Sequence, residues 1–167
     1  MSISKPIASA RLNRSISIDA KDRIDSMDIE FNNAASLDTN GTGWFVGFSD
    51  WAKAKLAGVR DLRYMPQCQR SHSLCMKWMQ HPAHDPRGAV KLASAGRTLS
   101  ILISEAGCFR LEFSPYQDFP ANQITRHTLN KQGDFVIWGA GLYHRWSVDK
   151  ACTILTLRWI PDDNVRA

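Results

Sequence analysis

Seven short segments with β-strand character follow one another between residues 89 and 159, and this succession limits the possible folds more than any other feature of the sequence. Within Thr98–Ser104, small polar and apolar residues alternate, which is the period expected where the two faces of a strand differ. Glycine, proline or acidic residues separate most of the segments. Short strands with turns every ~8–12 residues are typical of a β-sandwich or barrel, so the sequence predicts an all-β fold. The segments are Ala89–Ala93, Thr98–Ser104, Cys108–Phe113, Ile124–Leu129, Asp134–Trp138, Tyr143–Val148 and Cys152–Trp159.

The residues before these strands are predicted to form an N-terminal extension, residues 1–40, followed by a barrel domain of residues 41–167. Apolar residues at helical spacing between Ser17 and Ala35 predict a short helix, and residues 16–18 also allow a short strand. The extension is expected to pack on the barrel or to swap with a partner. The turn sequence Asn40–Gly43 ends the extension. Further strands are expected over Trp44–Phe48 and Leu74–Met79, and a loop over His81–Gly88, which contains two prolines and a glycine.

Composition is that of an ordinary globular protein. Hydrophobic residues make up 44% of the 167 positions and charged residues 22%. No apolar run approaches the ~18–20 residues that span a bilayer, and the first residues lack the apolar core of a signal peptide, so we expect a cytoplasmic protein without a membrane partner. The net charge of +5 comes from dispersed basic residues with no long basic run. Nucleic acid is therefore not an expected partner.

The run Gly133–His144 combines a strand entered by Gly-Asp, a glycine turn, and a histidine that opens the next strand. It resembles the second signature of the cupin family, Gly-x5-Pro-x-Gly-x2-His. Gly133, Gly141 and His144 match that signature, whereas Trp138 or Gly139 stands at the place of the proline. The resemblance implies a small jelly-roll barrel of two facing antiparallel sheets that covers roughly residues 74–160.

In metal-binding cupins the first signature, Gly-x5-His-x-His-x3-4-Glu-x6-Gly, supplies two histidines and a carboxylate, and the second signature supplies the last histidine. Here the corresponding Gly88–Ser94 contains no histidine, and Arg97 or Thr98 stands near the place of the glutamate. His144 is the one ligand of four that remains. The resemblance therefore implies a barrel without the usual metal site, and no cofactor is expected.

A different metal site is an alternative. His81 and His84 follow a predicted strand, and their loop could fold over the mouth of the barrel. His81, His84 and His144 would then offer three imidazoles to a divalent metal such as Fe, Mn, Ni or Zn. The same two loop histidines could instead lie in solvent, which is the more ordinary outcome, or contact a ligand that is not a metal.

Aromatic residues near His144 predict a small-molecule pocket. Trp146 shares the strand parity of His144, and Trp138 precedes the turn that presents the histidine. Aromatic walls around a few polar groups are typical of ligand pockets, although such rings could also simply fill the core. His144 is in addition the candidate catalytic residue, as a general base. The candidate ligand-binding residues are Trp78, Arg110, Trp138, Tyr143, His144 and Trp146.

Two arginines could hold an anionic group, depending on which strand face is turned inward. Arg110 or Arg158 would bind a carboxylate or phosphate through a bidentate contact if its side chain lay inside the barrel. On the last strand, Leu155, Leu157 and Trp159 occupy the other parity, which favours an outward Arg158.

Two functions follow from these observations. A binding protein would hold a small polar or anionic organic ligand in a Trp- and His-lined cavity without metal. The alternative is an enzyme, either a metal-dependent oxygenase- or isomerase-like cupin or a metal-free one with His144 as the base. A barrel filled by its own side chains would instead be a structural or interaction protein. We expect a homodimer, because cupins often pair through edge strands that would otherwise be exposed.

Overall fold

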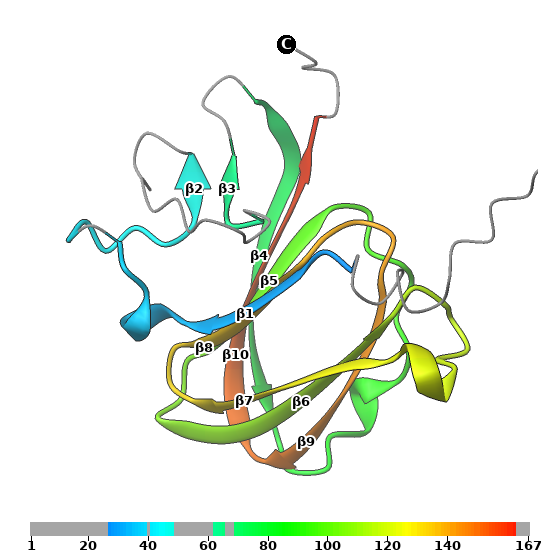
Figure 1. Cartoon of the computed structure of the whole chain (residues 1–167). Coiled ribbons are helices and arrows are strands. Elements are labelled where there is room, and N and C mark those ends of the chain that lie inside the picture. Colours follow the sequence, from blue (N-terminus) through cyan, green and yellow to red (C-terminus); the bar gives the residue numbers. More distant parts are fainter. Residues whose placement is uncertain (1–26, 40, 49–61, 66–68, 163–167) are drawn as a thin grey trace, which may run out of the picture.

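The computed structural model describes residues 27–39, 41–48, 62–65 and 69–162. These residues form strands, the segments between them and three 3₁₀ turns (Figure 1). The strands are β1 (Ile29–Asn33), β2 (Gly47–Phe48), β3 (Tyr64–Met65), β4 (Ser71–His81), β5 (Arg97–Leu102), β6 (Ala106–Ser114), β7 (Thr125–Lys131), β8 (Asp134–Trp138), β9 (Tyr143–Lys150) and β10 (Cys152–Pro161). The 3₁₀ turns are η1 (Ala34–Ser36), η2 (Pro86–Gly88) and η3 (Ala121–Gln123).

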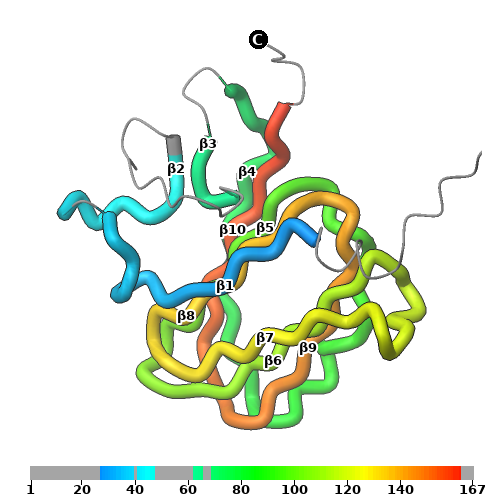
Figure 2. Tube along the Cα trace, viewed as in Figure 1, coloured from blue at the N-terminus to red at the C-terminus, as the bar shows by residue number. Residues whose placement is uncertain are grey.

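Two antiparallel sheets face each other, as Figure 1 and the tube in Figure 2 show. The larger has the order β1-β8-β5-β10-β4 and the smaller the order β7-β6-β9, whereas β2 and β3 form a separate parallel pair. The prediction of an all-β fold is confirmed. Side chains from both sheets meet in a continuous core, which includes Leu102, Phe109, Leu111, Phe113, Leu129, Val136, Trp138 and Ile154.

A second core covers the outer face of the five-stranded sheet. Leu99, Phe135 and Ile137 pack there with Leu62 and Met65 from the segment around β3. Arg97 Nη1 ties this segment to the sheet, because it donates hydrogen bonds to the carbonyls of Leu62 and Tyr64 at 2.9 and 2.7 Å. Both faces of the sheet's central strands are therefore buried, so an apolar residue there does not by itself mark the barrel interior.

This second core corrects the expectation for the last strand. Trp159 is buried in the outer core, and Leu155 and Leu157 pack against it. Thr156 and Arg158 of the same strand consequently face the barrel interior, where both line a cavity. The expected outward orientation of Arg158 was wrong, because the apolar parity of β10 packs outside the barrel.

Two predicted elements differ from the structure. The helix expected between Ser17 and Ala35 is contradicted in its described part, since Ile29–Asn33 form β1 and pair with β8; residues 17–26 lie outside the described residues. Ala89–Ala93 form no strand, yet this segment runs along β9: the amide of Lys91 donates to the carbonyl of His144 at 2.9 Å. Only Gly47–Phe48 of the strand expected from residue 44 onward is present.

Two glycines shape the surroundings of β9, which carries His144, one through its turn conformation and the other through a close backbone contact. Gly141 adopts a φ of 82° in the turn between β8 and β9, a left-handed conformation that glycine accepts readily. A Cβ at Gly88 would overlap the carbonyl oxygen of Trp146. The segment after β4 can therefore pack directly on the backbone of β9.

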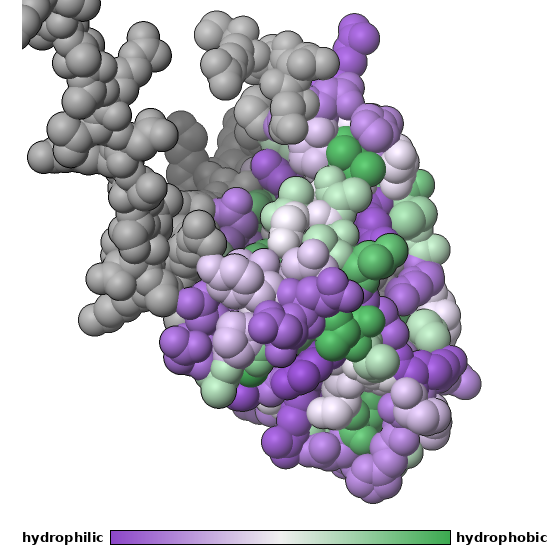
Figure 3. All heavy atoms as spheres, turned by 90° about the vertical axis from the view of Figure 1, so that its right-hand side faces the viewer, coloured by the Kyte–Doolittle hydropathy of each residue, from purple (hydrophilic) through white to green (hydrophobic). Residues whose placement is uncertain are grey.

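Among the described residues, no helix is long and apolar enough to cross a bilayer. On the face drawn in Figure 3, hydrophobic side chains form small separate groups among hydrophilic ones.

Candidate functional site

A small cavity of about 40 Å³ lies between the inner faces of the two sheets. Its wall combines aromatic rings, hydroxyl groups, two histidines and two cationic side chains. The lining residues are Lys77, His81, Thr98, Ser100, Phe109, Leu111, Trp138, His144, Trp146, Ile154, Thr156 and Arg158.

His144 enters the cavity from the second position of β9 and is 8% exposed. Its Nδ1 is buried and has no hydrogen-bond partner in the described part of the chain. Burial, together with the smaller effect of the positive charges of Arg158, Lys91 and Lys77, lowers the pKa of the imidazole from 6.5 to about 4. The ring is therefore neutral at pH 7, with an unused polar atom inside the barrel.

Trp138 and Trp146 form the aromatic wall predicted for the cavity. The ring of Trp138 lies 5.0 Å from that of His144, and its Nε1 donates a hydrogen bond of 2.7 Å to Ser94 Oγ. Trp146 contacts His81 at 4.6 Å between ring centroids. The indole N–H of Trp138 is satisfied away from His144, so it does not occupy the histidine's free nitrogen.

Lys77 and Arg158 bring positive charge to the same cavity, and both residues are also exposed to solvent. Lys77 lies opposite Thr156, and Thr156 lies opposite Ser100, so the three side chains form one row across β4, β10 and β5. Arg158 Nε donates to Thr98 Oγ1 at 3.2 Å in the neighbouring row. Partial burial lowers the pKa of Lys77, and the nearby Arg158 lowers it too. No carboxylate of the described residues lies within ion-pair distance of either cation.

A second hollow of about 180 Å³ lies next to the cationic side of the cavity. Lys77, Thr156 and Arg158 belong to both spaces, and Cys75 and Met76 complete the outer one. Because Cys75 is exposed and lies opposite Arg158, the hollow forms an entrance from solvent to the cations.

His81 lines the cavity as well, held by a buried carboxylate. Its Nδ1 lies 2.8 Å from Asp85 Oδ2, and Arg87 Nε donates to the other oxygen, Oδ1, at 2.8 Å. The hydrogen bonds from Arg87, together with that from His81, hold the pKa of Asp85 well below its usual range. An ionised carboxylate only accepts hydrogen bonds, so Nδ1 of His81 carries the proton and Nε2 keeps its lone pair. Burial lowers the pKa of His81, although Asp85 opposes the shift.

The other residues predicted to bind ligand lie elsewhere. Trp78 is 61% exposed on the outer face of edge strand β4. Arg110 lies on the outer face of the small sheet and forms an ion pair of 2.5 Å with Asp149. Tyr143 precedes His144 in β9 and so points to the opposite face. The structure thus brings His144, Trp138 and Trp146 together, and places Trp78, Arg110 and Tyr143 outside the cavity.

The three histidines of the alternative metal site do not converge. His84 is exposed, whereas His81 and His144 are buried. In the part of the chain that the structure describes, no group of three or more His, Cys, Asp or Glu side chains could hold a metal ion. The donors present therefore do not fit the metal site that the first cupin signature or the alternative would require.

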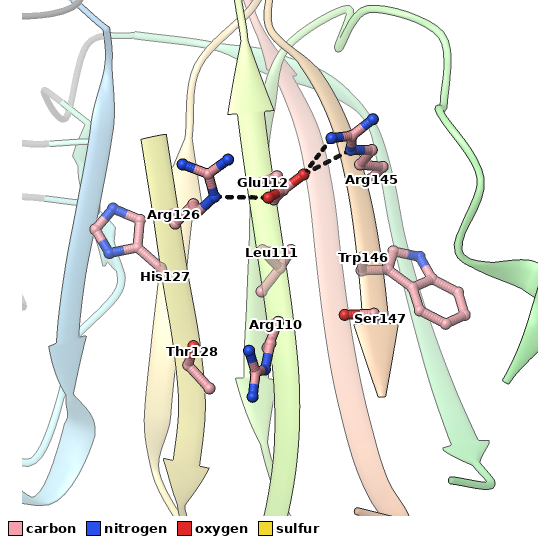
Figure 4. A pocket seen from close by; sticks show the side chains of 9 residues that line it. All are labelled: Arg110, Leu111, Glu112, Arg126, His127, Thr128, Arg145, Trp146 and Ser147. Atoms are coloured by element: carbon pink, nitrogen blue, oxygen red, sulfur yellow. Dashed lines mark hydrogen bonds and ion pairs between the residues drawn. The ribbon is translucent and has the colours of Figure 1, made fainter. Parts of the chain in front are cut away.

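A larger hollow of about 430 Å³ lies on the outer face of the small sheet (Figure 4). Three arginines surround it, but Glu112 accepts hydrogen bonds from Arg126 Nε at 2.7 Å and from Arg145 Nε at 2.6 Å. Arg110 is paired with Asp149. Since each arginine already has a carboxylate partner, this hollow offers less unbalanced charge to a ligand than the smaller cavity inside the barrel.

No known protein family and no curated protein sequence matches this chain. Among solved structures it is similar to a variant of 2-hydroxyethylphosphonate dioxygenase (HEPD), with 19% identity and a TM-score of 0.37 over 50% of this chain and 17% of that chain. It is also similar to HppE, as a cobalt(II) form in complex with Tris buffer (8% identity, TM-score 0.40, 53% of this chain and 51% of that chain). An iron(II) form of HppE in complex with substrate gives 11% identity and a TM-score of 0.39 over 56% of this chain and 54% of that chain. The matched part thus spans about half of those chains or less, and likenesses of this extent carry no information about the cavity.

Sequence reasoning missed Lys77 as a cavity residue, considered His81 only for the alternative metal site, and favoured an outward Arg158. Thr156 and Arg158 alternate with apolar residues in the sequence, which suggested a solvent-facing side. Ser100, within the alternating segment Thr98–Ser104, was the sequence signal for a polar inner face. It becomes informative once the pairing of this strand with the strand of Thr156 is known, because the two hydroxyl residues then lie on the same face.

Proposed function

We propose that this chain is a cupin-like small-molecule-binding protein that takes its ligand inside the barrel and lacks the usual cupin metal site. One observation carries this proposal: a buried, unpartnered nitrogen of His144 faces a cavity that also contains Trp138, Trp146 and two cationic side chains. A buried polar atom without a partner costs about 1–3 kcal/mol, so a ligand that bonds to it recovers part of that loss.

The cupin-like part of the proposal is supported by the region from Gly133 to His144. The sequence predicted a strand, a glycine turn and a histidine that opens the next strand, and β8, the turn at Gly141 and β9 follow in that order. The histidine of the run points into the barrel, where the family places its site.

A thermal-shift screen tests the proposal. Neutral, cationic and anionic small polar compounds are added to the purified full chain. A ligand at a hundredfold excess over its Kd stabilises a fold by about 2.7 kcal/mol, which raises the Tm of a chain of this size by roughly 5–11 °C. We expect the active compounds to lose their effect in Thr156→Val, which removes a hydroxyl from the cavity, and to keep it in Thr128→Val on the outer face. Absence of any stabilising compound, or the reverse pattern in the two variants, would refute ligand binding inside the barrel.

A second candidate function is favoured by the His81–Asp85 pair. With Nδ1 donating to Asp85 at 2.8 Å, Nε2 of His81 is a neutral base beside the cavity. It could take a proton from a carbon next to a carboxylate: the C–H bond breaks, the N–H bond forms, and the electron pair moves onto the carboxylate. The N–H of Nε2 exchanges its proton with solvent, and it then returns a proton to the carbon, so that the N–H bond breaks, the C–H bond forms again and the base is restored.

Deuterium exchange distinguishes this enzyme from a binding protein. Compounds that raise the Tm are incubated with the protein in deuterated water, and loss of the proton next to the carboxylate is followed by NMR. Exchange that disappears in His81→Gln would support a proton-transfer enzyme. Binding without exchange would leave the binding protein as the function.

A further inference from the structure

The inner face of the five-stranded sheet carries a row of groups that all bond well to oxygen atoms of an anion. Ser100 Oγ and Thr156 Oγ1 lie 3.1 Å apart, and Thr156 lies opposite Lys77 on β4. In the adjacent row, Arg158 lies between Cys75 and Thr98. Two hydroxyls, an ammonium and a guanidinium thus line one wall.

The charge of this wall is not balanced by its surroundings. Lys77 and Arg158 have no carboxylate within ion-pair distance among the described residues. Lys91, on the segment beside β9, adds a further positive charge near His144. Asp85 lines neither of the two adjacent spaces and is paired with Arg87 and His81. A bound anion would relieve this repulsion, whereas a cation would add to it.

His144 supplies an independent sign of a ligand. The side chain is more than nine-tenths buried, its Nδ1 has no partner in the described part of the chain, and it faces the same cavity from the opposite sheet. An imidazole nitrogen can donate a hydrogen bond to an oxyanion or accept one from its protonated form.

The size of the cavity limits the ligand. A water molecule needs about 10–15 Å³ of such space, so about 40 Å³ accommodates a group of a few heavy atoms. Drug-sized ligands require roughly 300–1,000 Å³. The inner cavity therefore suits the charged head of a small molecule, and the hollow of about 180 Å³ next to it would accommodate the remainder.

We propose that the barrel binds a small oxyanion, a carboxylate or a phosphate- or sulfate-type group, between Lys77, Arg158, the hydroxyls of Ser100 and Thr156, and His144. This inference rests on the proposed function and adds the chemical class of its ligand. Cys75 marks the entrance, so the bound anion lies between this thiol and the inner wall.

Titration with three simple anions tests the inference. Sodium sulfate, sodium phosphate and sodium acetate are each added at pH 7 against sodium chloride at equal ionic strength, with the tryptophan fluorescence of the chain, to which Trp138 and Trp146 contribute, as the signal. We expect saturable binding of at least one oxyanion. Arg158→Gln and Lys77→Gln should each weaken it about tenfold to a hundredfold, because hydrogen bonds to charged groups contribute that much. Arg110→Gln, on the outer face, should leave it unchanged.

A second readout covers the case in which a variant fails to fold. In the wild-type chain, the bound anion should slow the reaction of Cys75 with a thiol reagent, and Cys75→Ser identifies the signal of that thiol. The inference is overturned if no oxyanion binds saturably, or if Arg110→Gln weakens binding as much as Arg158→Gln. If neutral compounds bind with dependence on Thr156 while the three anions do not, only the ligand class is wrong. If nothing binds, the proposed function fails as well.

Discussion

Replacement of His144 by glutamine should remove a large part of the acid sensitivity of this fold. In the folded protein, burial and nearby cations hold the pKa of His144 at about 4, against 6.5 without them. The folded state therefore binds this proton less readily than the unfolded state does. The neutral ring contributes its full stability above about pH 6.5, and this stability is lost as the pH falls toward 4.

The expected size follows from the two pKa values. The complete shift corresponds to about 3 kcal/mol, since one pKa unit is about 1.4 kcal/mol. At pH 4.5 most of this is already lost, so the wild type should lose about 2.5 kcal/mol more than His144→Gln between pH 7.5 and pH 4.5. Because other titrating groups, including His81 and His127, act in both proteins, their contributions cancel in the difference.

Urea unfolding at the two pH values measures this difference. Cationic buffers with chloride are needed, because an oxyanion bound near the ring would raise the pKa of His144. Ring nitrogen NMR of the wild type gives the pKa directly as a second measurement. Equal loss of stability in both proteins, together with a pKa near 6.5, would refute the conclusion that His144 is a buried neutral base.

Three further outcomes are expected. Trp138→Phe should destabilise the fold by about 1–2 kcal/mol in urea unfolding, because it leaves the buried hydroxyl of Ser94 without its indole donor; an unchanged midpoint would contradict that hydrogen bond. Gly88→Ala should lower the Tm and shift tryptophan emission, since a Cβ there overlaps the backbone of Trp146. A wild-type Tm in this variant would show that the segment around Gly88 does not contact β9. Sulfate should bind more tightly to the wild type at pH 5 than at pH 8, because a bound anion favours the protonated form of His144. Fluorescence titration of His144→Gln should show a smaller pH dependence of sulfate binding. An identical pH dependence in both proteins would place the anion away from this ring.

The sequence predicted the part of the site that depends on local structure. From Gly133 to His144, strand, turn and strand follow one another without a long connection, so the turn alone fixes where the histidine points. Trp138 and Trp146 were placed correctly for the same reason, since one precedes that turn and the other shares the parity of His144.

The rest of the site could not be predicted because it depends on which face of each strand is turned inward. Alternation separates the two faces of a strand but does not label them. On β10 the apolar face packs against a second core, so Arg158 lies on the inner face and lines the cavity, although it is exposed, whereas Arg110 on β6 lies on the outer face with Asp149. The placement of Trp78 in the cavity has the same limit. A large apolar residue in a strand suggested the interior, but Trp78 lies on the outer face of an edge strand.

The helix expected between Ser17 and Ala35 shows a different limit. Its apolar spacing included Phe31, which lies in β1 and stacks on His127 at 5.1 Å. Pairing with β8 supplies backbone hydrogen bonds from residues about a hundred positions away in sequence. A local pattern contains no information about such a partner, and tertiary pairing determines the outcome.

The most direct test of the account is to locate an oxyanion in the protein. A crystal structure obtained with sodium selenate, which has the shape and charge of sulfate, would mark the anion by its anomalous scattering. We predict a selenium position inside the barrel, within hydrogen-bond distance of Arg158 or Lys77 and of the hydroxyl of Thr156. A selenate bound only at the outer arginines around Glu112, with none inside the barrel, would contradict it.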